Sequence, residues 1–230
     1  MIIITIDGPA GAGKSSVARK LAGRLGFDIL DTGATYRAVT YAAFSRGVDL
    51  ADDDAMARLA GEIDIRVEGP RVTVDGTDVS DAIRTPEVTS AIHFAADNPA
   101  VREKMAALQR RLAAGRDIVT EGRDQGTVVF PDAAVKIFLT ASPEERARRR
   151  HAELVARGAT ISYEETLATQ EDRDRRDAAR PIGALKRPPG AVEVATDGMD
   201  EDAVVQRLVE VVQATAPGIG SPANGRGDGR

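Results

Sequence analysis

The fold is decided by the N-terminal stretch Ile2-Ile3-Ile4-Thr5-Ile6-Asp7-Gly8-Pro9-Ala10-Gly11-Ala12-Gly13-Lys14-Ser15. Its continuous β-branched run, residues 2–6, is typical of a strand that is buried on both faces of a parallel sheet. From Lys14 to Leu25 apolar residues recur at helical spacing, and Gly26 follows where a helix C-cap belongs. The stretch therefore predicts a strand, a glycine-rich loop and a helix, the start of a βαβ unit.

The glycine-rich loop matches the pattern G-x-x-x-x-G-K-[ST] without error. In such a loop successive backbone N–H groups point inward and cradle a phosphate, and the N-terminus of the next helix adds partial positive charge. Lys14 can reach the β- and γ-phosphate oxygens, and the Ser15 hydroxyl can bind Mg²⁺. The alternative is a glycine-rich turn without a ligand. The motif favours a site for a nucleoside triphosphate with Mg²⁺, lined by Gly8, Pro9, Ala10, Gly11, Ala12, Gly13, Lys14, Ser15 and Ser16.

Strands and helices continue to alternate along the chain. Further strands are expected at 27–30, 117–120, 135–139 and 191–194, and helices at 34–46, at 86–114 with a break near Asn98-Pro99, from Ser142, from Ser162, and at 199–214. Residues 63–79 instead alternate apolar and polar side chains between turn dipeptides, which predicts a small antiparallel β insert. We therefore expect an α/β fold: a central parallel five-stranded sheet flanked by helices, with the strand C-termini at one edge.

Composition restricts the class of protein. The chain has 230 residues and a net charge of −5, which argues against a general nucleic-acid binder or a polybasic membrane binder. Cysteine is absent, so a disulfide scaffold and a thiol nucleophile are excluded. With no long apolar run and no signal peptide, we expect a cytoplasmic protein without a membrane partner. We expect a single domain over residues 1–214 and a disordered tail at 215–230, because the tail is rich in Gly, Pro and Arg.

Arginine-bearing segments follow the second and third expected strands. They are Asp31-Thr32-Gly33-x-x-Tyr36-Arg37 and Gly122-Arg123-Asp124. In the helix that begins at Ser162, Arg173, Asp177 and Arg180 share one face. Because a guanidinium fork matches two phosphate oxygens, these segments predict a cationic site for an anionic acceptor beside the phosphate loop. The alternative for the helix is a solvent-exposed face of ion pairs.

Four stretches together resemble the bacterial cytidylate kinases, over about residues 2–212: 6–15, 30–38, 121–133, and Arg173-Asp174-Arg175-Arg176-Asp177-x-x-Arg180. The resemblance implies a P-loop nucleoside monophosphate kinase fold and the reaction of ATP with CMP or dCMP to give ADP and CDP or dCDP. It also implies a CORE, an NMP-binding insert at about 34–100 that carries the small β insert, and a helical LID at about 157–181. The expected assembly is a monomer.

The resemblance also implies roles for single residues. The expected catalytic residues are Lys14, Arg123, Arg173 and Arg180, and the expected CMP site is lined by Asp31, Thr32, Tyr36, Arg37, Arg102, Arg123, Asp124, Arg173, Asp177 and Arg180. Arg37, Arg102 and Arg180 would hold the CMP phosphate in line, while Arg173 stabilises the γ-phosphoryl group in transit. No general base is required, because the acceptor is an ionised phosphate oxygen.

The chain departs from the family pattern at three places. His93 stands where a Ser near the cytosine is common, Ala178 replaces a Ser of the LID helix, and Ala195 replaces the first residue of the usual Asp-Thr-Thr loop on the adenine side. Two other functions stay open at this point. One is a kinase for another small anionic acceptor such as AMP, UMP or shikimate, and the other is a weakly active nucleotide-binding regulatory paralogue.

Overall fold

The phosphate loop joins β1 (Ile3–Asp7) to α1 (Lys14–Leu25) in the computed structural model, which describes residues 1–156 and 158–219. Beside β1 lie four further strands: β2 (Asp28–Asp31), β6 (Ile118–Gly122), β7 (Val135–Thr140) and β8 (Val192–Ala195). Their order is β2-β6-β1-β7-β8 and every pairing is parallel, which confirms the predicted five-stranded sheet. The C-terminal ends of these strands share one edge, and the phosphate loop leaves from that edge.

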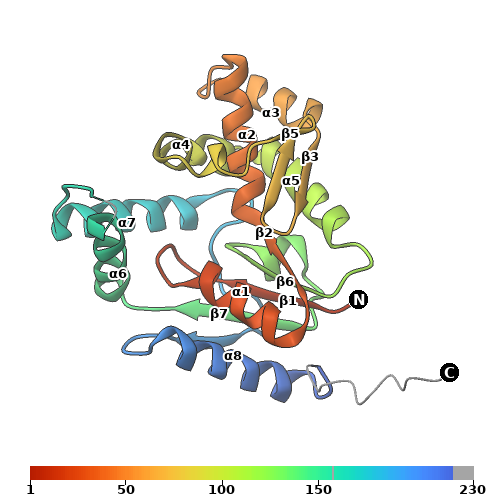
Figure 1. The fold of residues 1–230 in the computed structure, drawn as a ribbon, viewed down its shortest axis with the longest axis vertical. Helices are drawn as coiled ribbons and strands as arrows, with labels where there is room; N and C mark the ends of the chain where they lie inside the picture. The colour runs from red at the N-terminus through yellow and green to blue at the C-terminus, as the bar shows by residue number, and fades with distance from the viewer. Residues whose placement is uncertain (157, 220–230) are drawn as a thin grey trace.

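Helices cover both faces of this sheet. On one face α1 packs against α8 (Glu201–Thr215), and the two lie side by side in Figure 1. Leu21 of α1 and Leu208 of α8 are fully buried in one apolar cluster with Ile137 of the sheet. On the other face α5 (Pro99–Ala113) and the short π-helical turn Gln125–Val129 close a smaller cluster around Ile118. Burial on both faces explains why β1 is apolar without alternation.

A second group of elements lies at the top of Figure 1. It comprises α2 (Thr32–Arg46), α3 (Asp53–Glu62), β3 (Ile65–Glu68), β4 (Arg71–Val74), β5 (Thr77–Asp78), the 3-10 turn Ala82–Arg84 and α4 (Pro86–Asp97). The three short strands are antiparallel, as predicted, and pack with Met56 and Ile83 into a core of their own. The break before Pro99 was also expected. Helix α3 was not predicted, although Asp52 caps it and Met56, Leu59 and Ile63 are spaced along one helical face.

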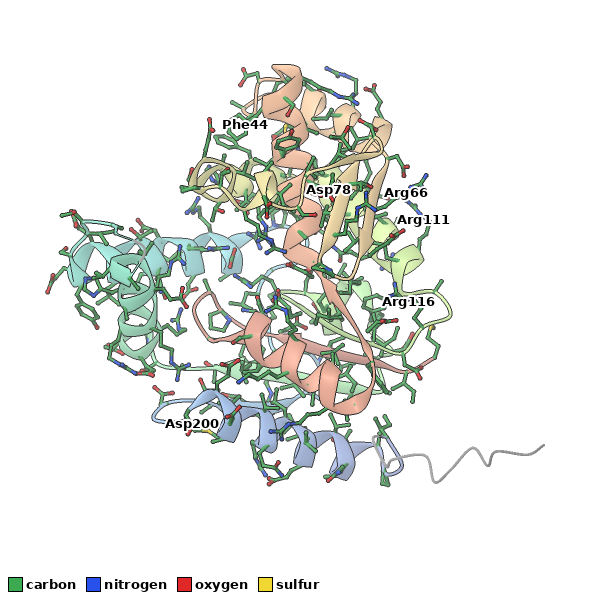
Figure 2. The ribbon with its side chains drawn as sticks, in the orientation of Figure 1. Phe44, Arg66, Asp78, Arg111, Arg116 and Asp200 are labelled. Atoms are coloured by element: carbon green, nitrogen blue, oxygen red, sulfur yellow. The ribbon has the colours of Figure 1, made fainter. Side chains whose placement is uncertain are left out.

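The third part is a helical arm formed by α6 (Pro143–Ala156) and α7 (Tyr163–Ala179), which contact each other at the side of the sheet (Figure 1). Ser162 and Glu165 form a capping box, and Ser142 accepts from the Glu145 N–H. Figure 2 places Arg66 and Asp78 on the small sheet and Asp200 at the start of α8, at the opposite end of the view. None of the helices in the described ranges combines the length and the apolar character that a bilayer crossing requires.

The expected start of the disordered tail, at residue 215, is wrong for the first residues of that segment. After α8 the chain turns, and the Ile219 N–H donates to the Ala216 carbonyl. Ile219 is 9% exposed and belongs to the same apolar cluster as Leu208. The polar composition of the tail hid this contact, because one isoleucine is enough to anchor a turn on an apolar helix face. Residues 220–230 lie outside the described residues.

Ile219→Ala is expected to lower the free energy of unfolding by about 2 kcal/mol, because it removes buried methyl groups at the end of a core cluster. The melting temperature should fall by about 4–8 °C for a chain of this size. Val155, which is 51% exposed, offers a matched control, and Val155→Ala should change stability by less than about 0.5 kcal/mol. Equal melting temperatures for the two variants would show that Ile219 does not pack on the core.

Candidate active site

The N-terminus of α1 is built to receive an anion. Its cap residue is Gly13 at φ 87°, no side chain caps the first N–H groups, and the first turn holds no acidic residue. The seven other α-helices of the described residues, by contrast, each have a first-turn N–H group capped by a side chain, namely Asp31, Asp52, Thr85, Asn98, Ser142, Ser162 and Asp200. At Gly8 a Cβ would lie 2.0 Å from the Leu139 carbonyl oxygen, so only glycine lets the loop pass β7. The loop thus offers open N–H groups at a positive helix end.

Two cations at this loop form no ion pair with any of the described residues. Lys14 is 5% exposed and donates to the Pro9 carbonyl oxygen at 2.7 Å. Burial, together with the nearby Arg123, lowers the pKa of Lys14 to about 7. Arg173 of α7 behaves similarly, because burial and then Arg123 lower its pKa to about 10. Among the described residues neither cation has a carboxylate within ion-pair distance. A phosphate group is the charge that this arrangement accommodates.

The other arginines of the expected site are paired with carboxylates. Arg37 contacts Asp31 at 3.2 Å, and Arg123 contacts Asp177 at 2.7 Å. Asp177 is 2% exposed and also contacts Arg180 at 2.5 Å. Burial pushes the pKa of Asp177 upward, but Arg123 and Arg180 outweigh burial and hold it below its usual value. The alternative of a solvent-exposed ion-pair face on α7 is therefore wrong at Asp177 and Arg180.

Arg102 is also paired with a carboxylate. It is 4% exposed, donates to the Ala96 carbonyl at 2.7 Å and contacts Asp124 at 2.5 Å. Its guanidinium carbon lies 5.5 Å from the ring centroid of Tyr36, a cation–π contact. Burial raises the pKa of Tyr36 to about 12. The chain after α7 passes directly over this group, since a Cβ at Gly183 would lie 2.1 Å from Arg102 Nη2.

The remaining expected residues are placed as follows. Thr32 is buried and donates to the Glu121 carbonyl at 2.7 Å, so it ties the start of α2 to β6. Ser16 donates to the Gly13 carbonyl at 3.0 Å. At the three departures from the family pattern, His93 is half-buried on α4, while Ala178 and Ala195 are exposed. The His93 Nδ1 atom lies 2.9 Å from the Ser90 carbonyl oxygen.

Two further buried carboxylates, which were not predicted as site residues, lie at the strand ends. Asp7 accepts the backbone N–H groups of Gln125 and Gly126 at 2.8 and 2.7 Å, and burial raises its pKa to about 6. Asp7 therefore pins the turn after Arg123 to the strand that carries the phosphate loop. Glu121 accepts from the Ser15 hydroxyl at 2.9 Å. Their position in the sequence could have indicated them, because each lies at the C-terminal end of a buried parallel strand, where ligands bind.

The oxygen atoms at Ser15 fit Mg²⁺. The Ser15 hydroxyl and the Glu121 carboxylate are hard oxygen ligands of the kind that this ion prefers. In the part of the chain that the structure describes, no three carboxylate, His or Cys side chains gather into a metal site. Such a sparse set suits an ion that takes most of its ligands from phosphate oxygens and water.

Comparison with known proteins agrees with this geometry. The family model described as cytidylate kinase matches residues 4–214. The chain belongs to the cytidylate kinase family. Members named cytidylate kinase include that of Rhodopirellula baltica, 55% identical over 94% of this chain and 96% of its own length. Another is that of Caldanaerobacter subterraneus subsp. tengcongensis, 45% identical over 94% of this chain and 96% of its own.

Solved structures share the fold at much lower identity. The shikimate kinase from Acinetobacter baumannii in complex with shikimate is 13% identical, with a TM-score of 0.50 over 94% of this chain and 96% of that one. An uncharacterized protein from Eubacterium ventriosum is 12% identical, with a TM-score of 0.51 over 93% of this chain and 99% of that one. These likenesses bear on the fold alone, which is a P-loop kinase fold as predicted.

Lys14→Met is expected to stabilise the ligand-free protein, because it removes a buried charge that has no partner. The folded pKa is about 7 and the ordinary value is 10.5, so the folded chain bears the full cost of charging Lys14 below pH 7 and none above pH 10.5. The gain should therefore be about 1–3 kcal/mol at pH 7 or below and should vanish toward pH 10.5. Urea unfolding across this pH range measures it. Lys104→Met, at an exposed lysine, serves as the control and should show no such pH dependence. A loss of stability in Lys14→Met at pH 6 would contradict the conclusion that Lys14 is a destabilising buried charge in the ligand-free protein.

Proposed function

We propose that this protein transfers the γ-phosphoryl group of ATP to CMP, giving ADP and CDP, and that it also accepts dCMP. The observation that carries the proposal is the unpaired charge of Lys14 and Arg173 beside an open phosphate loop, facing a set of arginine–carboxylate pairs. Membership of the cytidylate kinase family supports CMP as the acceptor.

The donor phosphates bind to residues 8–16. The N–H groups of the loop and Lys14 hold the β- and γ-phosphates, and we assign Mg²⁺ to the Ser15 hydroxyl beside Glu121. When bound, Mg²⁺ neutralises charge on the β- and γ-phosphate oxygens. Gln170 of α7 lies close over the loop, since its Oε1 would be 3.0 Å from a Cβ at Gly11. This cover favours exclusion of water from the donor site.

The acceptor oxygen needs no base, so catalysis consists of positioning and charge neutralisation. Arg123 connects the donor side and the acceptor side of the site. It pairs with Asp177, and its positive charge lowers the pKa values of Lys14 and Arg173. We assign Arg173 to the γ-phosphoryl group in transit. Arg37 and Arg180 contact CMP with the donors that their carboxylates leave free. Asp31, Thr32, Tyr36, Arg102, Asp124 and Asp177 complete the walls of the CMP site.

The division into parts follows from these roles. We propose that residues of about 34–100 form the NMP-binding part, that residues of about 157–181 form the LID, and that the rest of residues 1–214 is the CORE. The small antiparallel sheet then belongs to the NMP-binding part, and α7 belongs to the LID. We further propose that the protein is a cytoplasmic monomer.

The function is tested by ADP release with ATP and Mg²⁺ in the presence of CMP, dCMP, UMP or AMP. We expect rapid turnover with CMP and dCMP and much slower turnover with UMP and AMP. Chelation of Mg²⁺ should abolish turnover. Lys14→Met serves as the inactive control and should lose about a hundredfold or more in kcat. AMP or UMP as the preferred acceptor, or ADP release that no nucleotide stimulates, would overturn the proposal.

Arg180→Lys keeps the charge but loses the planar fork, so it tests direct contact with CMP. We expect kcat/KM for CMP to fall about tenfold or more. Because Arg180 is largely buried between two carboxylates, the free energy of unfolding should also fall, by about 1 kcal/mol. Arg175→Lys, on the exposed side of α7, is the matched control with normal kinetics. Unchanged kinetics in Arg180→Lys would remove Arg180 from the CMP site.

A further inference from the structure

The C-terminal end of α4 holds two arginines of the proposed CMP site. Arg180 Nε donates to Asp97 Oδ1 at 2.6 Å, and Arg102 Nη1 donates to the neighbouring Ala96 carbonyl at 2.7 Å. Asp97 is the last residue of α4, and Asn98 at once begins to cap α5. The C-terminal end of a helix carries partial negative charge, so the Ala96 carbonyl and the Asp97 carboxylate both attract cations. This junction is therefore an anionic anchor point for guanidinium groups.

Arg180 needs an anchor because of its place in the chain. It follows Ala179, the last residue of α7, and precedes Pro181, so no helix continues through it. Asp177 contacts it at 2.5 Å but belongs to α7 itself, so that contact cannot fix Arg180 relative to α4. The hydrogen bond to Asp97 joins the end of the proposed LID helix to the proposed NMP-binding part.

The hydrogen bonding also leaves one side of the guanidinium open. Nε is engaged by Asp97 and Nη2 lies beside Asp177, while Nη1 has no partner among the described residues. The side chain of Asp97 is 33% exposed and that of Arg180 is 8% exposed, so the pair lies at the border of the site. A carboxylate that holds Nε restricts rotation of the planar group and thereby fixes the direction of the Nη1 hydrogens.

We propose that Asp97 is a positioning residue for the acceptor: it holds Arg180 so that Nη1 points to CMP when the end of α7 meets α4. The proposal rests on the proposed contact between Arg180 and CMP. The opposite role, competition between Asp97 and CMP for Arg180, makes a different prediction. If Asp97 instead competed with CMP for Arg180, its removal would strengthen CMP binding, since one negative charge would leave the site.

The experiment is a double-mutant cycle with Asp97→Ala, Arg180→Ala and the double variant, together with Asp97→Asn. We expect Asp97→Ala to raise KM for CMP about tenfold, while KM for ATP stays within about twofold, because only the acceptor contact is misplaced. Asp97→Asn keeps an oxygen that accepts from Nε and should recover part of the loss. In the Arg180→Ala background Asp97→Ala should add almost nothing. Glu87→Ala removes an exposed carboxylate from the other end of α4 and should leave both KM values unchanged.

Each outcome decides a different point. Normal CMP kinetics in Arg180→Ala would remove the proposed Arg180 contact and the positioning role with it, while the acceptor panel would still report on kinase activity. Impaired Arg180→Ala beside normal Asp97→Ala would overturn only the positioning role. A lower KM for CMP in Asp97→Ala, or additive effects in the double variant, would also overturn it. Calorimetric titration with CMP, on variants shown by melting curves to be folded, repeats the comparison without turnover.

Discussion

The rest of the site depends on buried positive charge that the protein leaves without a partner. Lys14 is 5% exposed, stands at the uncapped start of α1, and has its pKa lowered to about 7 by burial and by Arg123. Such a group is costly in the free protein, because desolvation opposes its charged form, and Glu121 and Asp177 offset that cost only in part. In the proposed function, a triphosphate supplies the negative charge that pairs with Lys14. The same buried charge that destabilises the free fold would then provide binding free energy for the donor.

The proposed acceptor side differs from the donor side, because its arginines are already paired with carboxylates. Arg37, Arg102, Arg123 and Arg180 each contact a carboxylate, from Asp31, Asp124, Asp177 and Asp97 respectively. Pairing keeps several guanidinium groups close together without strong mutual repulsion and fixes their planes. In the proposed function, CMP therefore contacts hydrogen-bond donors that these planar groups leave free, rather than an unpaired net charge. Asp177 links the two halves, since it contacts both Arg123 and Arg180.

Local signals in the sequence predicted most of the architecture. The run Ile2–Ile6, the loop at 8–15 and Gly26 correctly placed β1, the phosphate loop and α1, because buried strands, glycine loops and C-caps are read within about ten residues of chain. Ser142 and Ser162 likewise marked the starts of α6 and α7. Even α3, which was missed, has a local cap and apolar spacing. The roles of the single arginines stay predictions.

The sequence by itself determined the strand, glycine loop and helix that form the predicted phosphate site, because the required backbone and the lysine are contiguous in the chain. Only the tertiary structure decided which carboxylate meets which arginine. Asp97 and Arg180 are 83 residues apart, and Arg123 and Asp177 are 54 apart. The burial of Asp7 and the packing of Ile219 also became visible only there. An ion pair between distant segments leaves no periodic trace in either segment, so its partners are known only once packing has brought the elements together.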